Sequence, residues 1–110
     1  MNTYKIYQVR KEHLREYGFR SVYHHWDLPF VAGVPKDIWE LAYTYRTRKN
    51  LTLDRIYAIF NQQCEDIPMP DDYNGRSMSV SDIVEDPDGS LWYCNSIGWR
   101  HVRWEEDVHD

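Results

Sequence analysis

Three short runs of alternating apolar residues, all between residues 73 and 102, constrain the fold more than any other feature of the chain. They are separated by two turn sequences, Asp88-Gly89 and the segment 95–98. Asp-Gly tolerates the positive φ angles of a two-residue hairpin loop, so we predict a tight turn there. The apolar positions of these predicted strands are Val80, Ile83, Leu91, Tyr93 and Val102.

Two earlier segments also predict strands. Residues 4–9 are rich in Tyr, Ile and Val, and residues 39–46 alternate strictly between large apolar side chains and smaller or polar ones. In the second segment the alternation places one set of side chains on a single face: Trp39, Leu41, Tyr43 and Tyr45. A register slip of one residue would send the aromatic rings to solvent, so the pairing is well specified.

A helix is predicted after residue 52, where Thr52 is a typical N-cap and Asp54 lies in the first turn. An apolar stripe follows at helical spacing: Leu53, Ile56, Tyr57 and Phe60. Residues 18–26 have helical spacing too, although Val22 and Tyr23 also suit a strand.

This order of elements predicts an α+β fold: a small antiparallel sheet of about five strands with one or two helices packed on one face. The length suits a single domain, which we expect over residues 1–104. Residues 105–110 are expected to form a charged, frayed C-terminal tail.

The net charge of −5 is unevenly distributed along the chain. Residues 1–63 carry ten basic and six acidic side chains, whereas residues 64–110 carry three basic and twelve acidic ones. The acidic character of residues 64–110 disfavours direct binding to nucleic acid, because nucleic-acid-binding proteins are basic where they touch phosphate. Two interpretations of these acidic residues stay open: they form a solvated surface, or they attract a basic partner electrostatically.

The composition indicates a cytoplasmic protein. No apolar run approaches the roughly 20 residues that span a bilayer, and the first residues have a strand pattern rather than that of a signal peptide. Cys64 and Cys94 have no partner pattern, so reduced thiols are expected. The spacing of His24, His25 and Asp27 does not favour a metal site, and we expect no cofactor.

No residue set predicts catalysis. Cys94 and His101 suggest a nucleophile and a base, but a Cys inside a predicted strand is more often a small buried side chain. The carboxylates of Asp82, Glu85 and Asp86 are expected to be solvated, whereas acid–base work needs one of a pair to be desolvated. The chain is therefore expected not to be an enzyme.

The best surface-site candidate is the segment 98–104, where aromatic rings alternate with arginines. Trp and Arg are enriched at binding hot spots, although an amphipathic edge strand would have the same pattern. Together with the acidic residues, the predicted partner-binding set is Asp71, Asp72, Glu85, Asp86, Asp88, Trp99, Arg100 and Arg103.

Two segments of the chain also carry a family resemblance: G-R-S-M-S-V-S-D-I-V (residues 75–84) and W-Y-C-N-S-I-G-W (residues 92–99). In these segments the chain most strongly resembles the YodL-like family of small bacterial proteins. The similarity extends to Y-K-I-Y-Q-V (residues 4–9), W-E-L-A-Y-T-Y (residues 39–45) and T-L-D-R-I-Y-A-I-F-N (residues 52–61). The resemblance implies a non-enzymatic domain carried by conjugative elements and phages, often beside antirestriction modules.

We therefore expect an acidic binding protein that inhibits a bacterial host protein, most concretely an anti-CRISPR or antirestriction inhibitor. The protein would inhibit its target by direct protein–protein contact, and its acidic residues would in addition mimic nucleic acid. The alternative is a regulatory module that binds a bacterial housekeeping protein through an aromatic surface. A homodimer is a further alternative, because exposed strand edges pair readily with another chain.

Overall fold

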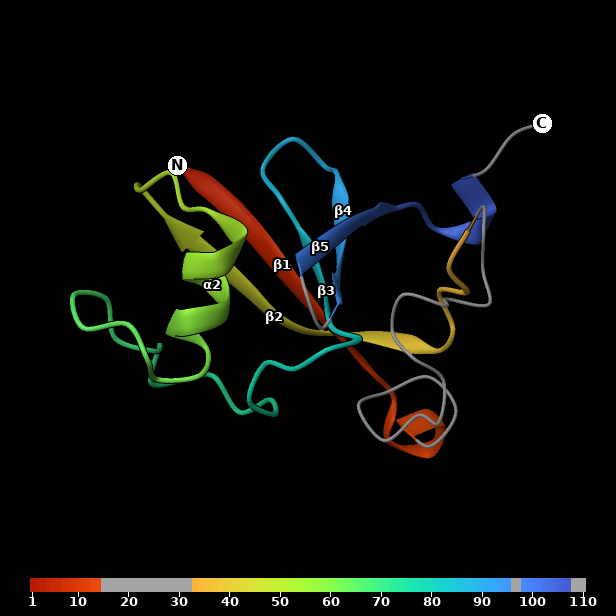
Figure 1. Ribbon diagram of the computed structural model, residues 1–110, viewed down its shortest axis with the longest axis horizontal. Coiled ribbons are helices and arrows are strands. Elements are labelled where there is room, and N and C mark those ends of the chain that lie inside the picture. The colour runs from red at the N-terminus through yellow and green to blue at the C-terminus, as the bar shows by residue number, and fades with distance from the viewer. Residues whose placement is uncertain (15–32, 96–97, 108–110) are drawn as a thin grey trace.

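Five strands form one antiparallel sheet in the computed structural model, which describes residues 1–14, 33–95 and 98–107. The order across the sheet is β2-β1-β3-β4-β5, so the first strand lies near its middle (Figure 1). The predicted α+β class and the five-stranded antiparallel sheet are confirmed. The strands are β1 (Asn2–Val9), β2 (Trp39–Thr47), β3 (Ile83–Glu85), β4 (Leu91–Asn95) and β5 (Gly98–Val102).

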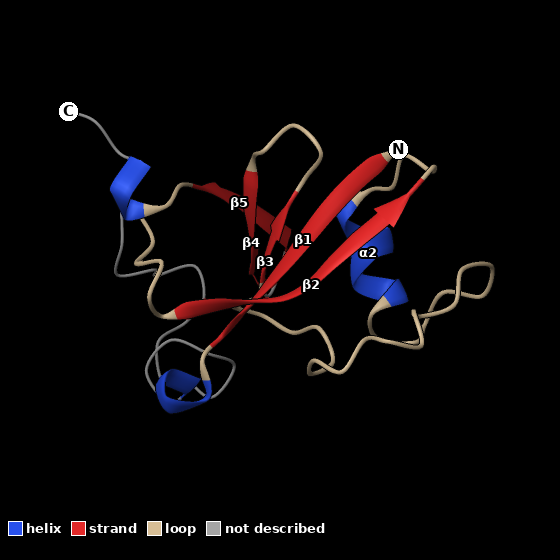
Figure 2. Ribbon diagram, turned by 180° about the vertical axis from the view of Figure 1, so that it is seen from behind, coloured by secondary structure: helices blue, strands red, loops and turns tan. Residues whose placement is uncertain are grey.

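The helix α2 (Leu53–Ile59) packs on one face of this sheet, as Figures 1 and 2 show from opposite sides. The predicted N-cap is confirmed, because Thr52 Oγ1 accepts a hydrogen bond from the Arg55 backbone N–H at 3.2 Å. Ile56 and Phe60 are buried against the sheet. The ambiguous segment 18–26 lies outside the described residues.

A β-bulge in β2 overturns the prediction that its four large side chains share a face. Tyr43 pairs with Ile6 and Leu41 pairs with Tyr7, which leaves Ala42 as an extra residue. Because side chains alternate along a strand, one extra residue reverses the facing of everything beyond it. Trp39 therefore lies on the face opposite to Tyr43, and Leu41 is 51% exposed.

The bulge allows a core on each face of the sheet. Between the sheet and α2 lies the helix-side core, which includes Tyr4, Ile6, Ile56, Phe60 and Val84. The second core lies on the opposite face and includes Val9, Trp39, Ile83, Tyr93 and Trp104. Successive residues of β3 thus serve different cores, so this three-residue strand is buried on both faces.

The β3–β4 hairpin has a three-residue loop, not the predicted two-residue turn. Asp86 N–H donates to the Ser90 carbonyl at 2.9 Å, and Gly89 N–H donates to the Asp86 carbonyl at 2.9 Å. A two-residue loop would have placed Pro87 at the last paired position, where a strand residue must donate an N–H that proline lacks. Pro87 is instead the second residue of a turn over residues 86–89, which the bond from Gly89 to Asp86 closes, and Gly89 has φ +86°.

The expected frayed tail is ordered in its first part. Residues Glu105–Asp107 form a short 3₁₀ helix, η2, and the Glu105 N–H donates to the Val34 carbonyl at 2.9 Å. The Lys36 ammonium lies 3.3 Å from the Glu106 carboxylate. The prediction is wrong for these three residues because the segment before β2 supplies partners for them. A second 3₁₀ turn, η1 (Lys11–His13), follows β1.

We expect Gly89→Ala to destabilise the domain by about 1–2 kcal/mol, because a Cβ disfavours a left-handed backbone. No atom lies within 4 Å of the added Cβ, so the cost is purely conformational. Gly89→Asn should cost less, since asparagine adopts this conformation more readily. Urea unfolding of both variants measures the difference. Equal losses would contradict the conformational explanation.

Candidate functional site

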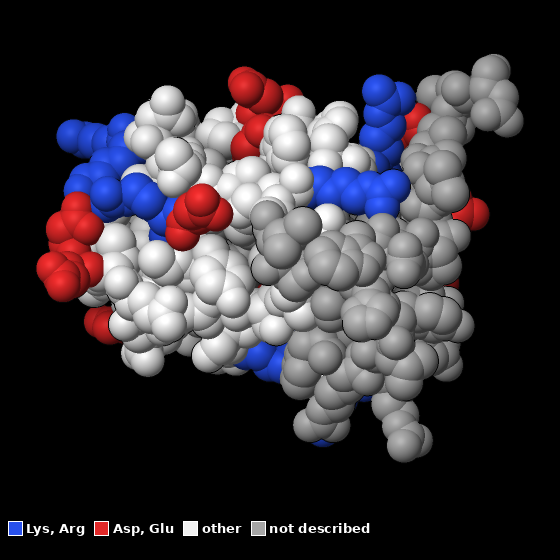
Figure 3. All heavy atoms as spheres, in the orientation of Figure 1, with Lys and Arg blue, Asp and Glu red and all other residues white. Residues whose placement is uncertain are grey.

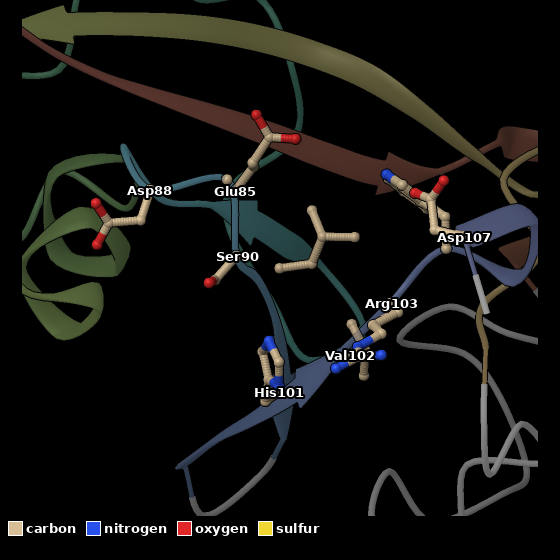
Figure 4. A pocket seen from close by; sticks show the side chains of 10 residues that line it. Glu85, Asp88, Ser90, His101, Val102, Arg103 and Asp107 are labelled. Carbon is tan, nitrogen blue, oxygen red and sulfur yellow. The ribbon is translucent and has the colours of Figure 1, made fainter. Parts of the chain in front are cut away.

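A groove of about 440 Å³ lies beside the β3–β4 hairpin, where the end of β5 and the turn η2 also meet (Figure 4). Three carboxylate side chains line it: Glu85, Asp88 and Asp107. Arg103 and His101 contribute nitrogen atoms, while Leu91, Val102 and Trp104 supply apolar surface. Three of the predicted partner-binding residues, Glu85, Asp88 and Arg103, are thus brought together at one site.

The apolar part of the groove is held firmly by aromatic packing. The Trp104 ring is 5% exposed and meets the Tyr7 ring edge-on, with centroids 5.0 Å apart. The Lys36 ammonium lies 5.7 Å from the Trp104 centroid on the ring face. Burial, followed by the charge of Glu85, raises the pKa of Tyr7. Sequence reasoning missed the role of Trp104, whose neighbour Val34 is seventy residues away in the chain.

Asp86 orders the hairpin loop that carries Asp88. One carboxylate oxygen accepts hydrogen bonds from the backbone N–H groups of Asp88 and Ser90, both at 3.0 Å. The other accepts from the indole Nε1–H of Trp92 at 2.9 Å. Its predicted contact with a partner stays a prediction, and the structure adds this internal role.

The other two predicted acids lie elsewhere. Asp71 and Asp72 are exposed in the long loop between α2 and β3, and Asp72 accepts a hydrogen bond from the Tyr43 hydroxyl at 2.6 Å. Burial, reinforced by Asp72, raises the pKa of Tyr43 to about 12. Tyr43 belongs to the helix-side face of the sheet, whereas Glu85 lies on the opposite face. There the Glu85 carboxylate lies 3.9 Å from the Lys5 ammonium. On the face that Figure 3 shows, the acidic side chains of the described residues lie in separate groups, not in one continuous patch.

Trp99 and Arg100 are neighbours in β5 and therefore point to opposite faces of the sheet. The Trp99 indole Nε1–H donates to Asp54 Oδ1 at 2.9 Å and so faces the helix. Arg100 pairs with Tyr93, a member of the opposite core. Neither residue lines the groove that contains Arg103.

Asp82 is buried, which corrects the prediction that its carboxylate is solvated. It is 3% exposed, and Oδ2 accepts hydrogen bonds from Gln8 Nε2 at 3.1 Å and from the Ser79 N–H at 3.0 Å. Burial raises the pKa of Asp82 to about 7, while the Ser79 and Gln8 bonds act in the opposite direction. The alternating apolar pattern stops just before this position, so nothing in the sequence indicated that the Asp82 side chain is buried.

Gln8 connects this carboxylate to the loop. Its Nε2 also donates to the Arg76 carbonyl at 3.0 Å, and its Oε1 accepts from the Arg76 N–H at 3.1 Å. The Arg76 guanidinium donates to the Val9 carbonyl at 2.7 Å. The Tyr73 hydroxyl donates to the Arg76 carbonyl as well. Gly75 has no room for a side chain, since an added Cβ would lie 2.6 Å from that hydroxyl.

The thiol of Cys94 is a poor candidate nucleophile. It is buried, and desolvation followed by the charge of Asp82 raises its pKa to about 12, so the thiol stays protonated. Ser90 and His101 both line the groove, yet no hydrogen bond joins them, and the His101 ring instead packs at a tilt against Trp92. Among the described residues no three His, Cys, Asp or Glu side chains are placed to hold a metal ion. His24, His25 and Asp27 lie outside this part of the chain.

One family model matches the chain: the YodL-like domain, over residues 3–104. No curated protein and no solved structure matches it significantly. Within the described residues, the structure contains no helix with the length and apolar character needed to cross a membrane.

We expect the stability of the domain to fall as pH rises from about 4 to about 7 because of Asp82. In this range the folded state keeps a proton that the unfolded carboxyl, with its ordinary pKa near 4, has already lost. The contribution is at most about 4 kcal/mol and levels off above pH 7. Urea unfolding between pH 4.5 and 7.5 measures it.

Asp82→Asn should flatten this pH dependence relative to the native chain, whereas Asp71→Asn, on an exposed carboxylate, should leave it unchanged. If Asp82→Asn retained the native slope, the buried carboxyl would not be its source.

Proposed function

Because the chain belongs to the YodL-like domain family, we propose that it is a non-enzymatic binding protein of a mobile genetic element that inhibits a bacterial host protein. Its most concrete form is an anti-CRISPR or antirestriction inhibitor that acts by protein–protein contact. The observation that carries this proposal is the groove, in which Glu85, Asp88 and Arg103 surround an apolar floor.

Such a groove suits a protein surface that normally holds nucleic acid. Effectors of this kind present Lys and Arg side chains to phosphates, and the exposed Asp88 would attract the same side chains. Val102, the half-buried apolar residue of the lining, would supply the apolar contact that slows dissociation of the complex. Since Asp72 lies at Tyr43, away from the groove that contains Glu85 and Asp88, the mimicry is local to the groove and does not imitate a length of phosphate backbone.

The non-enzymatic part of the proposal is supported by the protonated, buried thiol of Cys94 and by the lack of a base hydrogen-bonded to Ser90. Carboxylates in the groove belong to exposed or half-buried residues. None of them is desolvated as a general acid would need to be.

Asp88→Lys should weaken inhibition by on the order of tenfold, because it places a positive charge where a basic partner would bind. Asp71→Lys makes the same change in net charge at an exposed position away from the groove and should have little effect. The measurement is plasmid transformation into strains with a defined CRISPR or restriction system, with and without the protein. Purified effector then gives the dissociation constant for each variant.

Two outcomes would contradict the proposal. Equal loss with both variants would mean that net charge, not the groove, matters. The Asp88→Lys protein could also inhibit the CRISPR or restriction system fully while its thermal melt matches the native one. That result would exclude the groove as the binding surface.

A regulatory module that binds a housekeeping protein through aromatic contacts is the second candidate. It is favoured by the partly exposed indole rings of Trp92 and Trp99 on the β4–β5 hairpin. Salt separates the two candidates, because a charge-driven complex weakens steeply between low and high ionic strength. An aromatic interface should change little, as titration calorimetry at two salt concentrations would show.

A further inference from the structure

The β4–β5 hairpin carries the same arrangement twice: an indole N–H that donates to an aspartate. Trp99 Nε1 lies 2.9 Å from Asp54 Oδ1, and Trp92 Nε1 lies 2.9 Å from Asp86 Oδ2. Each bond fixes a carboxylate at the edge of an indole ring. The two aspartates come from distant segments, the first turn of α2 and the hairpin loop.

Both units lie on the same face of the hairpin. Trp92 pairs with His101 and Cys94 pairs with Trp99, so these four side chains project from the helix-side face. The His101 ring lies against Trp92, with centroids 5.1 Å apart and planes at 47°. The groove beside Trp104 is lined by Leu91 and Val102, whose side chains lie on the other face. The two indole–carboxylate units therefore lie on the face opposite to Leu91 and Val102, and His101 borders both the groove and this face.

A cavity of about 250 Å³ opens beside Trp99. Asp54 and Tyr57 line it from α2, and Asn95 lines it from β4. This volume is below that of a usual small-molecule pocket and suits a single side chain. Asp54 has one carboxylate oxygen with no hydrogen bond to any described residue, and Asn95 Oδ1 is buried and likewise unpartnered. The described residues that line this cavity thus include hydrogen-bond acceptors and no Lys, Arg or His side chain.

We propose that this face binds arginine side chains from an extended segment of a partner protein. A guanidinium stacks flat on an indole ring while its N–H groups reach a carboxylate at the ring edge. One arginine would enter the cavity between Trp99 and Tyr57 and donate to Asp54. The second would lie on Trp92 beside Asp86. Phosphate ligands are excluded, because both carboxylates would repel them.

The spacing of the two units predicts the sequence pattern of the partner. Trp92 and Trp99 are diagonal neighbours across two antiparallel strands, a relation that separates residues by about 7–8 Å. Alternate side chains of an extended peptide are about 7 Å apart. Arginines at positions i and i+2 therefore match the two sites. This inference rests on the proposed function only in taking the partner to be a protein.

Short capped peptides test the inference without any inhibition assay. The probes are a pentapeptide with Arg at positions 2 and 4 between glycines, its Lys counterpart, and a peptide with the two arginines adjacent. The indole N–H resonances of Trp92 and Trp99, assigned with single Trp→Phe variants, report binding. We expect saturable shifts of both with the alternating Arg peptide, and binding roughly three- to tenfold weaker with the other two.

Asp54→Asn keeps the shape of the site but removes its charge, and should weaken binding of the alternating Arg peptide by a similar factor. Asp37→Asn makes the same charge change on the segment before β2 and should bind normally. Equal binding of the Arg and Lys peptides, or native affinity in a folded Asp54→Asn protein, would overturn the inference. Loss of inhibition by Asp88→Lys alongside unchanged peptide binding would separate the groove from this surface.

Discussion

The buried contact between Gln8 and Asp82 determines where the second half of the chain lies. β3 has only three residues, too few to fix its own register against β1. The Gln8–Asp82 pair continues that register by one residue, and the bonds from Gln8 to Arg76 hold the preceding loop across the end of β1. The Trp39 indole N–H adds a bond to the Ser81 carbonyl at 2.8 Å. Because β3 leads into the hairpin, the groove and the indole–carboxylate face both depend on this cluster.

An acidic side chain at the centre of such a cluster costs stability near neutral pH. A carboxylate that is 3% exposed loses most of its hydration, and its two hydrogen bonds offset only part of that loss. Asp82 has a structural role in return, because its Oδ2 accepts hydrogen bonds from two donors at once. These are the Ser79 backbone N–H and the Gln8 side chain on β1. An apolar residue there would leave the Ser79 N–H and one of the two N–H groups of Gln8 without an acceptor.

Local patterns in the sequence predicted local structure well. The alternation in β1 and β2, the cap at Thr52 and the stripe on α2 each depend on residues within one or two turns of the chain. The bulge at Ala42 was not predictable in this way, since it is visible only when β2 is paired with β1. Pro87 did carry the information that excludes a two-residue loop, and the preference of Asp-Gly for such loops obscured it.

The candidate site was predicted only in part, for a related reason. Charge and residue type selected Glu85, Asp88 and Arg103, which line one groove, but could not distinguish them from Asp71 and Asp72 in the loop between α2 and β3. Asp54 was assigned only to the helix terminus, because its contact with Trp99 spans forty-five residues. Side chains brought together by tertiary structure leave no periodic trace in the sequence.

The strand order has a consequence for how the chain reaches its native state. β1 pairs with β2, and its other edge receives β3 from nearly eighty residues further along. Closing so long a loop is entropically costly and makes folding slow compared with that of a helical domain of the same size. Until β3 arrives, the β1–β2 pair presents a bare inner edge rich in Tyr and Ile. During synthesis this interval is when the chain is most exposed to pairing with the wrong strand.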